Sequence, residues 1–78
     1  MPRFFLHYRE PDDLIADEEG LELPDLNAAR REAARAGRDI LAEKVQLQQE
    51  LNHDAIEIAD ESGRVLETIA LKDLIKLP

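Results

Sequence analysis

The stretch from residue 25 to about residue 48 is the one long segment with a helical period, so it limits what the rest of the chain can fold into. At about 100° per residue, its small and apolar side chains share one stripe of the helix. The members of this stripe are Leu26, Ala29, Ala33, Ala36, Gly37, Ile40, Leu47 and Leu51. Asp25, directly after Pro24, suits an N-cap, and the helix is expected to end near Gln48.

Between residues 29 and 37 this stripe contains only alanine and glycine. A stripe this thin lets another backbone come close, either a sheet that packs on the helix or a second helix in a dimer seam. Both interpretations remain open at this point. The opposite, polar side carries three candidate polar-face contacts, Arg31, Arg35 and Arg38. Lys44 is out of place, because it lies on the apolar stripe.

The composition is that of one small folded domain. The chain has 78 residues, of which 44% are hydrophobic and 36% are charged, so it can form a core, although a marginal one. It has no cysteine, which excludes disulfides and thiolate metal sites. No apolar run reaches the roughly 20 residues of a membrane span, and no secretory signal pattern opens the chain. A soluble cytoplasmic protein that contacts no membrane is therefore expected.

The formal net charge of -8 is unevenly distributed. Residues 10–25 contain eight acidic side chains and residues 50–63 contain five more, and neither segment includes lysine or arginine. The basic side chains gather between them, along the helix. Because so many acids would repel a polyanion, nucleic acid is disfavoured as a partner.

The remaining segments are typical of short strands. Residues 3–9 hold all three aromatic side chains, with apolar residues at both parities, as in a central strand. Residues 15–20 (IADEEG) and 58–63 (IADESG) are alike, each with Asp before a turn and Gly at its end. We interpret both as β-hairpins, in which Asp17 pairs with Leu21 and Asp60 pairs with Arg64. Residues 71–77 are expected to form a closing helical turn.

These elements predict an α+β fold in a single domain over residues 1–78, with the order β-β-β-α-β-β and a short C-terminal helical turn. A small antiparallel sheet, built from an N-terminal strand and two hairpins, would pack on the one long central helix. Each hairpin register gives one apolar face. The predicted core consists of Leu26, Ala33 and Ile40 of the helix with Ile15, Leu23, Ile56, Ile58 and Leu66 of the sheet.

The motifs that carry chemistry are weak. The acidic turn at residues 12–20 has the composition of a calcium loop but not its D-x-D-x-D-G spacing, so a solvated acidic hairpin is the simpler interpretation. His7 and His53 are far apart in the chain, Ser62 lies inside a turn, and no Gly-rich phosphate loop is present. A helix on one small sheet offers little cleft for a nucleophile. We expect no enzymatic activity, no cofactor and no metal.

Several motifs resemble those of a known family. They are MPRFF with His7 at the start, DEEG followed by LPDL within residues 17–26, and IEIADESGRVL at residues 56–66. On the basis of these motifs, the chain resembles the short alphaproteobacterial proteins of the domain of unknown function 6894 family over nearly its whole length. The resemblance implies shared turns and packing and no particular activity. Residues 23–26 also resemble, more faintly, HicB-type antitoxins, in which a small sheet ends in Pro-Asp-Leu before a helix.

The sheet face that the helix leaves uncovered is the candidate interface. By parity it is predicted to carry Phe5, His7, Leu14, Ala16, Val65 and Ile69. Clustered apolar side chains of this kind commonly mark a protein interface. We therefore expect a non-enzymatic protein-interaction module that forms a homodimer through this face or a strand edge beside it, with a heterologous protein partner as the next choice. The alternative is an antitoxin-like or regulatory domain that binds a toxin or nucleic acid.

Overall fold

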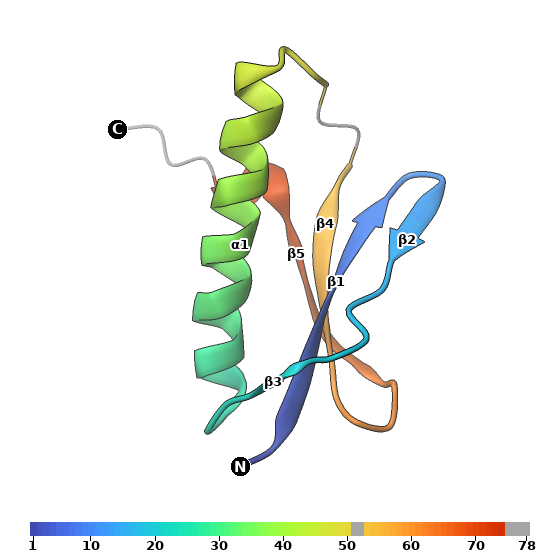
Figure 1. Ribbon diagram of the computed structural model, residues 1–78, viewed down its shortest axis with the longest axis vertical. Helices are drawn as coiled ribbons and strands as arrows, with labels where there is room; N and C mark the ends of the chain where they lie inside the picture. The colour runs from blue at the N-terminus through green and yellow to red at the C-terminus, as the bar shows by residue number, and fades with distance from the viewer. Residues whose placement is uncertain (51–52, 75–78) are drawn as a thin grey trace.

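The computed structural model describes residues 1–50 and 53–74. Its elements are β1 (Arg3–Glu10), β2 (Asp13–Ile15), β3 (Leu21–Glu22), α1 (Leu26–Gln46), β4 (Ala55–Ala59), β5 (Val65–Ala70) and the 3-10 helix η1 (Leu71–Leu74). Figure 1 shows α1 along one side of a five-stranded antiparallel sheet. The part of the chain described here contains no second α-helix that would cover the other side. This arrangement confirms the predicted α+β fold and the order of its elements.

Both ends of α1 follow from the local sequence. At the start, the Asp25 carboxylate accepts the Ala28 N–H at 2.8 Å, as the predicted N-cap requires. At the end, the N–H of Leu47 still donates into the last turn, and the backbone then reaches a φ of 57° at Gln48. The helix therefore stops slightly earlier than predicted. Leu51, expected on the same stripe, lies outside the described residues.

β1 is the central strand of the sheet, as its aromatic-rich sequence predicts. The strand order is β2-β1-β4-β5, and β3 pairs with the beginning of β1. One side of β1 faces β4 over its whole middle, while the other side is shared between β2 and β3. A helix over one face requires apolar residues at one parity only, and the apolar residue at the other parity, Phe5, lies on the face that α1 leaves uncovered.

The first predicted hairpin is wrong in its pairing. β2 and β3 do not pair with each other, because each of them pairs with β1. The hairpin that forms is β1–β2, with Glu10 opposite Asp13. β1 offers eight residues against three in β2 and two in β3, so each short strand makes its ladder with the long one. Ile15, predicted in the core, is 53% exposed, since β2 lies at the edge of the sheet and away from α1.

The turn of the second hairpin, β4–β5, is confirmed. The Asp60 N–H donates to the Arg64 carbonyl at 3.0 Å, which is the predicted pairing at the end of the hairpin. Gly63 adopts a φ of 88°, a left-handed conformation that glycine reaches without steric cost. The local Asp-Glu-Ser-Gly sequence is therefore sufficient to place this turn.

Past the turn, a β-bulge changes which side chains of β5 face the helix. Ala59 opposes Val65, but Leu66 is then an extra residue and the register shifts between Ile58 and Ala59. One inserted residue moves all later side chains of the strand to the other face. Leu66, predicted in the core, is 38% exposed. Ile69 faces the helix instead of the sheet face that α1 leaves uncovered.

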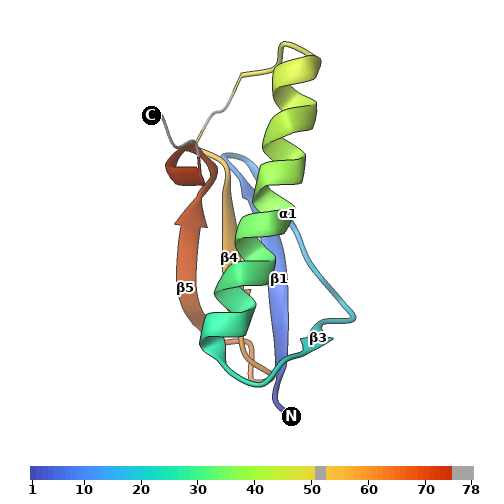
Figure 2. The ribbon, with the colours of Figure 1, turned by 90° about the vertical axis from the view of Figure 1, so that its left-hand side faces the viewer.

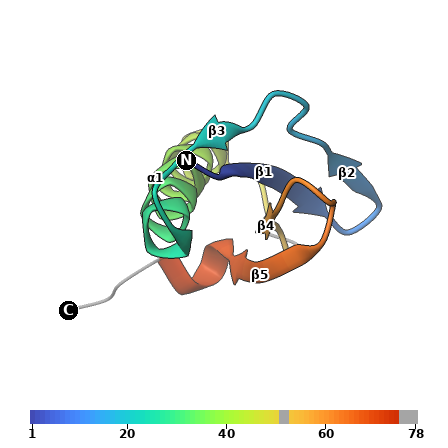
Figure 3. The ribbon, with the colours of Figure 1, turned by 90° about the horizontal axis from the view of Figure 1, so that it is seen from below.

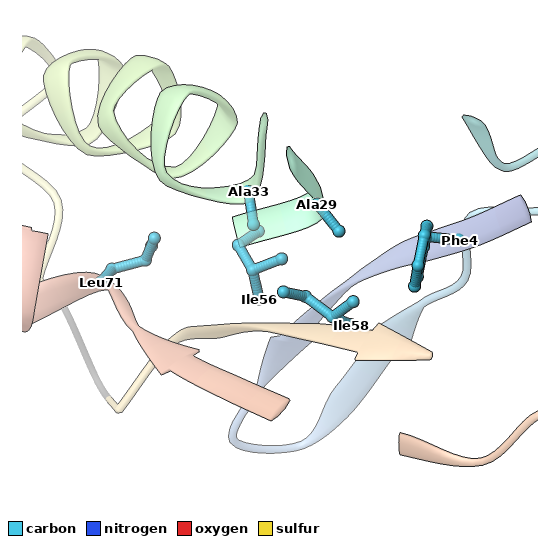
Figure 4. Packing of buried hydrophobic residues seen from close by; sticks show 6 residues of the cluster. All are labelled: Phe4, Ala29, Ala33, Ile56, Ile58 and Leu71. Carbon is cyan, nitrogen blue, oxygen red and sulfur yellow. The ribbon is translucent and has the colours of Figure 1, made fainter. Parts of the chain in front are cut away.

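The core lies between α1 and the middle of the sheet. Figure 4 shows its buried cluster, which consists of Phe4, Ala29, Ala33, Ile56, Ile58 and Leu71. Partly buried side chains pack around this cluster, namely Leu6, Tyr8, Leu23, Leu26, Ile40, Ile69 and Leu74. All three predicted helix residues and three of the predicted sheet residues thus belong to the core or its lining, and the exceptions are Ile15 and Leu66.

The thin stripe of α1 is used for close packing within the chain. Ala29 and Ala33 are fully buried, and a Cβ added at Gly37 would collide with the methyl groups of Leu71 and Leu74. The sheet and η1 thus occupy the side of the helix that a dimer seam would need. η1 also confirms the closing helical turn over residues 71–74, while the rest of that predicted segment lies outside the described residues.

Candidate functional site

The candidate site is the sheet face opposite α1, called here the outer face. In Figure 2 the helix lies in front of the sheet, so the outer face is behind it. The strand registers place on this face Arg3, Phe5, His7, Arg9, Leu14, Glu22, Ala55, Glu57, Ala59, Val65, Thr68 and Ala70. Four of the predicted interface residues are among them, namely Phe5, His7, Leu14 and Val65.

The other two predicted interface residues have different positions. Ala16 is exposed in the segment that follows β2. Ile69 lies opposite Ile56 and packs against the core, so its assignment to the open side is wrong. The bulge in β5 is the reason, because it reverses the parity on which the assignment depended.

Phe5 and His7 are half-buried on the outer face because they lie against each other and against the chain. Their rings stack with centroids 6.3 Å apart and planes inclined by 17°. A Cβ at Gly20 would lie only 2.9 Å from the Phe5 ring, so the ring covers this glycine. His7 Nδ1 accepts the Asp17 N–H at 2.9 Å, which requires the neutral ring with its proton on Nε2.

The Asp17 carboxylate fills a gap in the ladder of β1. β2 and β3 leave one stretch of β1 without a neighbouring strand, and there the Leu6 N–H donates to Asp17 Oδ2 at 3.1 Å. The other oxygen of Asp17 accepts the N–H groups of Glu19 and Gly20. Burial disfavours the charged carboxylate, but these backbone bonds outweigh it and hold the pKa of Asp17 below its usual value.

The charged side chains on the outer face form ion pairs with each other. Arg9 Nε lies 2.9 Å from Glu57, and Arg3 lies 3.0 Å from Glu22. Exposed pairs of this kind contribute only about 0 to 1 kcal/mol each to stability. Their effect on the surface is larger, because the outer face is electrically balanced in a molecule whose formal net charge is -8.

A buried polar cluster on the helix side joins residues that sequence reasoning did not connect. Asp54 is 3% exposed, and its Oδ2 accepts the Tyr8 hydroxyl at 2.5 Å and lies 2.6 Å from Lys44 Nζ. Glu10 is a more distant partner of the same ammonium, at 3.8 Å. This cluster explains why Lys44 interrupts the apolar stripe of α1. That misplaced lysine was the one sequence signal for the cluster.

The electrostatics of this cluster fix its protonation state. Burial opposes the charge of Asp54, but hydrogen bonds from Lys44 and Tyr8 overcome it and lower the pKa of Asp54. The hydrogen bond to Asp54 raises the pKa of Lys44. Burial raises the pKa of Tyr8, and the hydrogen bond to Asp54 raises it further. At neutral pH the cluster is an ion pair with a neutral tyrosine. It ties the end of α1 to β1 and to the residue before β4.

A pocket of about 260 Å³ lies beside this cluster and is lined by His53, Asp54, Ala70 and Lys72. Asp54, the carboxylate in this lining, is already bonded through Oδ2 to Tyr8 and Lys44. Within residues 1–50 and 53–74, no three histidine, aspartate or glutamate side chains gather as metal ligands would. The acidic turns use their carboxylates locally, since Asp17 and Asp60 both accept backbone N–H groups.

The predicted polar-face contacts are on the far side of the molecule from the outer face. Arg31, Arg35 and Arg38 are all exposed on α1. Arg35 lies 3.3 Å from Glu32 in an i,i+3 pair, which contributes at most a few tenths of a kcal/mol. The structure therefore does not join these arginines and the outer face into one site.

The fold and its surface define a class, a small α+β domain with one helix on a single face of an antiparallel sheet. Residues 3–72 match the model of a family described as a domain of unknown function (DUF6894), and the chain belongs to this family. The resemblance of its turn and packing motifs is thereby confirmed. No curated protein and no solved structure matches the chain. Neither helix of the described residues is both long and apolar enough to cross a membrane.

Proposed function

We propose that this chain is a non-enzymatic, cytoplasmic protein-interaction domain that forms a homodimer through the open side of its sheet. The open side means the outer face together with the free edge of β5 that borders it. One observation carries the proposal: apolar side chains remain exposed there, 37% for Leu14, 47% for Val65 and 38% for Leu66. Val65 and Leu66 are neighbours in β5, and Leu14 lies across the sheet in β2. Exposed apolar groups on an uncovered surface commonly mark an interface.

The distribution of charge supports contact between two copies. Two molecules with a net charge of -8 repel each other at long range. At the outer face, however, Arg9 pairs with Glu57 and Arg3 pairs with Glu22. A second copy that approaches this side meets balanced charges, so like-charge repulsion is smallest there.

The size of the domain also favours association. A chain of 78 residues with one small buried core has little stability to spare. Any surface that a partner buries adds to the stability of the folded state by mass action. A second copy is always present at the same concentration, which makes it the first partner to test.

Sedimentation equilibrium at micromolar concentration tests the proposal. The wild-type chain is expected to show a dimeric mass, and Val65→Glu is expected to shift the mass toward that of a monomer. Val45→Glu is the matched control, because Val45 is 65% exposed on α1, away from the open side. A monomeric wild type, or equal masses for both variants, would contradict the proposal.

The second candidate is a regulatory domain that binds a toxin or nucleic acid. The exposure of Arg31, Arg35 and Arg38 on α1 favours it, because exposed cations can contact an anionic partner. A co-transcribed toxin-like neighbour in the genome would support this candidate, and salt-sensitive binding of nucleic acid that Arg35→Ala weakens would support it directly.

A further inference from the structure

The two edges of the sheet differ in how they are protected. At the β1 side, β2 and β3 contain only three and two residues. Between them the carboxylate of Asp17 takes the Leu6 N–H, so this backbone donor is not available to another chain. Short edge strands and inward-pointing charges are the usual ways of closing an edge.

The β5 edge has backbone groups that point away from the sheet. The Leu71 N–H donates to the Asp54 carbonyl at 2.9 Å, which shows that the main chain of residue 71 faces β4. Because these groups alternate in direction along a strand, the N–H and C=O of Thr68 and Ala70 face outward. Among the described residues no strand lies beyond β5, and Figure 3 shows β5 at the border of the sheet.

The sequence of β5 contains little that would prevent pairing. It has no lysine and no proline between residues 65 and 70. Its one charged side chain, Glu67, is directed toward α1, where Arg30 binds it at 2.8 Å. Within residues 65–70 the bulge at Leu66 is a protective feature, and it leaves the strand regular from residue 67 onward.

We propose that β5 pairs in antiparallel fashion with β5 of a second copy, so that two sheets become one continuous sheet across the dimer. This inference rests on the proposed homodimer and specifies its contact. A two-fold axis requires that the same segment binds itself, and the outward groups of β5 fulfil this condition. Both α1 helices then lie on one side of the joined sheet.

The parity of β5 selects one register. A pairing centred on Ile69 sets Thr68 of each copy opposite Ala70 of the other, so the outward N–H and C=O groups of both residues bond across the seam. It also sets the two Ile69 residues opposite each other, a β-branched cross-strand pair. A pairing centred on Glu67 would oppose two like charges, and one centred on Thr68 would set Ala70 opposite Leu66, where the bulge interrupts the strand.

The alternative contact, outer face against outer face, is less well supported by the side chains. The larger groups of that face, Phe5 and His7, already lie against each other and against Gly20. Glu57 is only 16% exposed beneath Arg9. Two of the three exposed apolar side chains, Val65 and Leu66, belong to β5 itself, beside the proposed seam.

The test compares three variants by sedimentation equilibrium. Thr68→Pro removes an outward N–H and fits an edge strand, so it is expected to raise the dimer dissociation constant about tenfold or more. Thr68→Val keeps the backbone donor and the branched side chain, and should preserve the dimer. Leu14 lies on the outer face near the opposite edge of the sheet, so Leu14→Glu should also preserve the dimer.

The outcomes separate the inference from the proposed function. A dimer that survives Thr68→Pro but is lost in Leu14→Glu would show that the outer faces meet, which overturns the edge contact and leaves the homodimer intact. A monomeric wild type would overturn both.

A second measurement needs no variant and covers the case in which Thr68→Pro does not fold. In amide hydrogen exchange of the wild type, Thr68 and Ala70 are expected to exchange slowly at high protein concentration and rapidly at low concentration. The amides of Glu67 and Ile69 face β4 and should be protected at both concentrations. A dimer in which Thr68 and Ala70 exchange rapidly would overturn the inference.

Discussion

The turns at residues 17–20 and 60–63 share their local chemistry and differ in their surroundings. In both, the aspartate Oδ1 accepts the N–H two residues later, at 3.2 Å in the first turn and 2.9 Å in the second. In both, the closing glycine is left-handed, with φ of 71° at Gly20 and 88° at Gly63. The second turn closes a hairpin, whereas the first fixes a connecting segment to β1 through Leu6 and His7.

This difference teaches that a turn motif determines its own conformation but not what the turn connects. The space around the two glycines differs in the same way. A Cβ at Gly20 would meet Arg3, the Phe4 carbonyl and Phe5 at 2.9 Å, while a Cβ at Gly63 would meet nothing within 4 Å. One turn is embedded in the fold and the other stands in solvent, so equivalent substitutions should have unequal effects.

Gly20→Ala is expected to have the largest effect. The new Cβ adds a steric conflict with the β1 backbone to the cost of a left-handed φ, so the free energy of unfolding should fall by about 2 to 4 kcal/mol. Urea denaturation monitored by circular dichroism measures this loss. A loss below about 0.5 kcal/mol would mean that the segment can move off β1.

Asp17→Ala is expected to cause the second-largest loss of stability. It leaves the half-buried Leu6 N–H without an acceptor, which should cost about 1 to 3 kcal/mol. Asp17→Asn is the control, since its amide oxygen can still accept one of the backbone bonds, and it should cost less. Asp60→Ala should cost less than Asp17→Ala, because water can replace the lost bonds in an exposed turn. Equal losses for the two alanine variants would contradict the contrast between the turns.

Gly63→Ala should reduce stability by about 1 kcal/mol, the cost of placing an alanine in the left-handed region without any collision. The same urea titration provides the value. If this loss equalled that of Gly20→Ala, backbone conformation alone would explain both, and the contact of Gly20 with β1 would be irrelevant to stability.

Lowering the pH should produce the smallest difference in stability between variants of the two turns. Their own hydrogen bonds hold the pKa of both Asp17 and Asp60 below 3.8 in the folded state. Each therefore stabilises the fold above its unfolded pKa, and this contribution is lost as pH falls through the folded pKa. Denaturation midpoints between about pH 5 and pH 2 should fall less steeply in Asp17→Asn than in wild type. Asp60→Asn should change the slope less, because water can replace the lost hydrogen bonds of an exposed turn.

Sequence reasoning succeeded where the decisive interaction is local. Asp25 after Pro24 marks the start of α1, and the turn at residues 60–63 needs only its own side chains. Sequence reasoning failed where several strands compete for the same partner strand. Nothing within residues 15–23 shows that β1 would take both β2 and β3.

The candidate site was partly predictable for the same reason. Strand parity placed Phe5, His7 and Leu14 on the open side, because β1 and β2 are regular there. It misplaced Leu66 and Ile69, because a bulge adds one residue without a sequence signal as strong as a proline or glycine. The cluster of Tyr8, Lys44 and Asp54 joins three separate parts of the chain, and pairs so distant in sequence have no period to reveal them.

The hydrogen bond between Tyr8 and Asp54 gives this protein an optical reporter of its own. The chain contains one tyrosine and no tryptophan, so its near-ultraviolet emission comes from Tyr8 alone. A tyrosine whose hydroxyl donates to a carboxylate emits weakly, and its fluorescence recovers when that bond breaks. Opening of this bond, which joins β1 to the residue before β4, can therefore be followed in real time as an increase in light, without any label attached to the molecule.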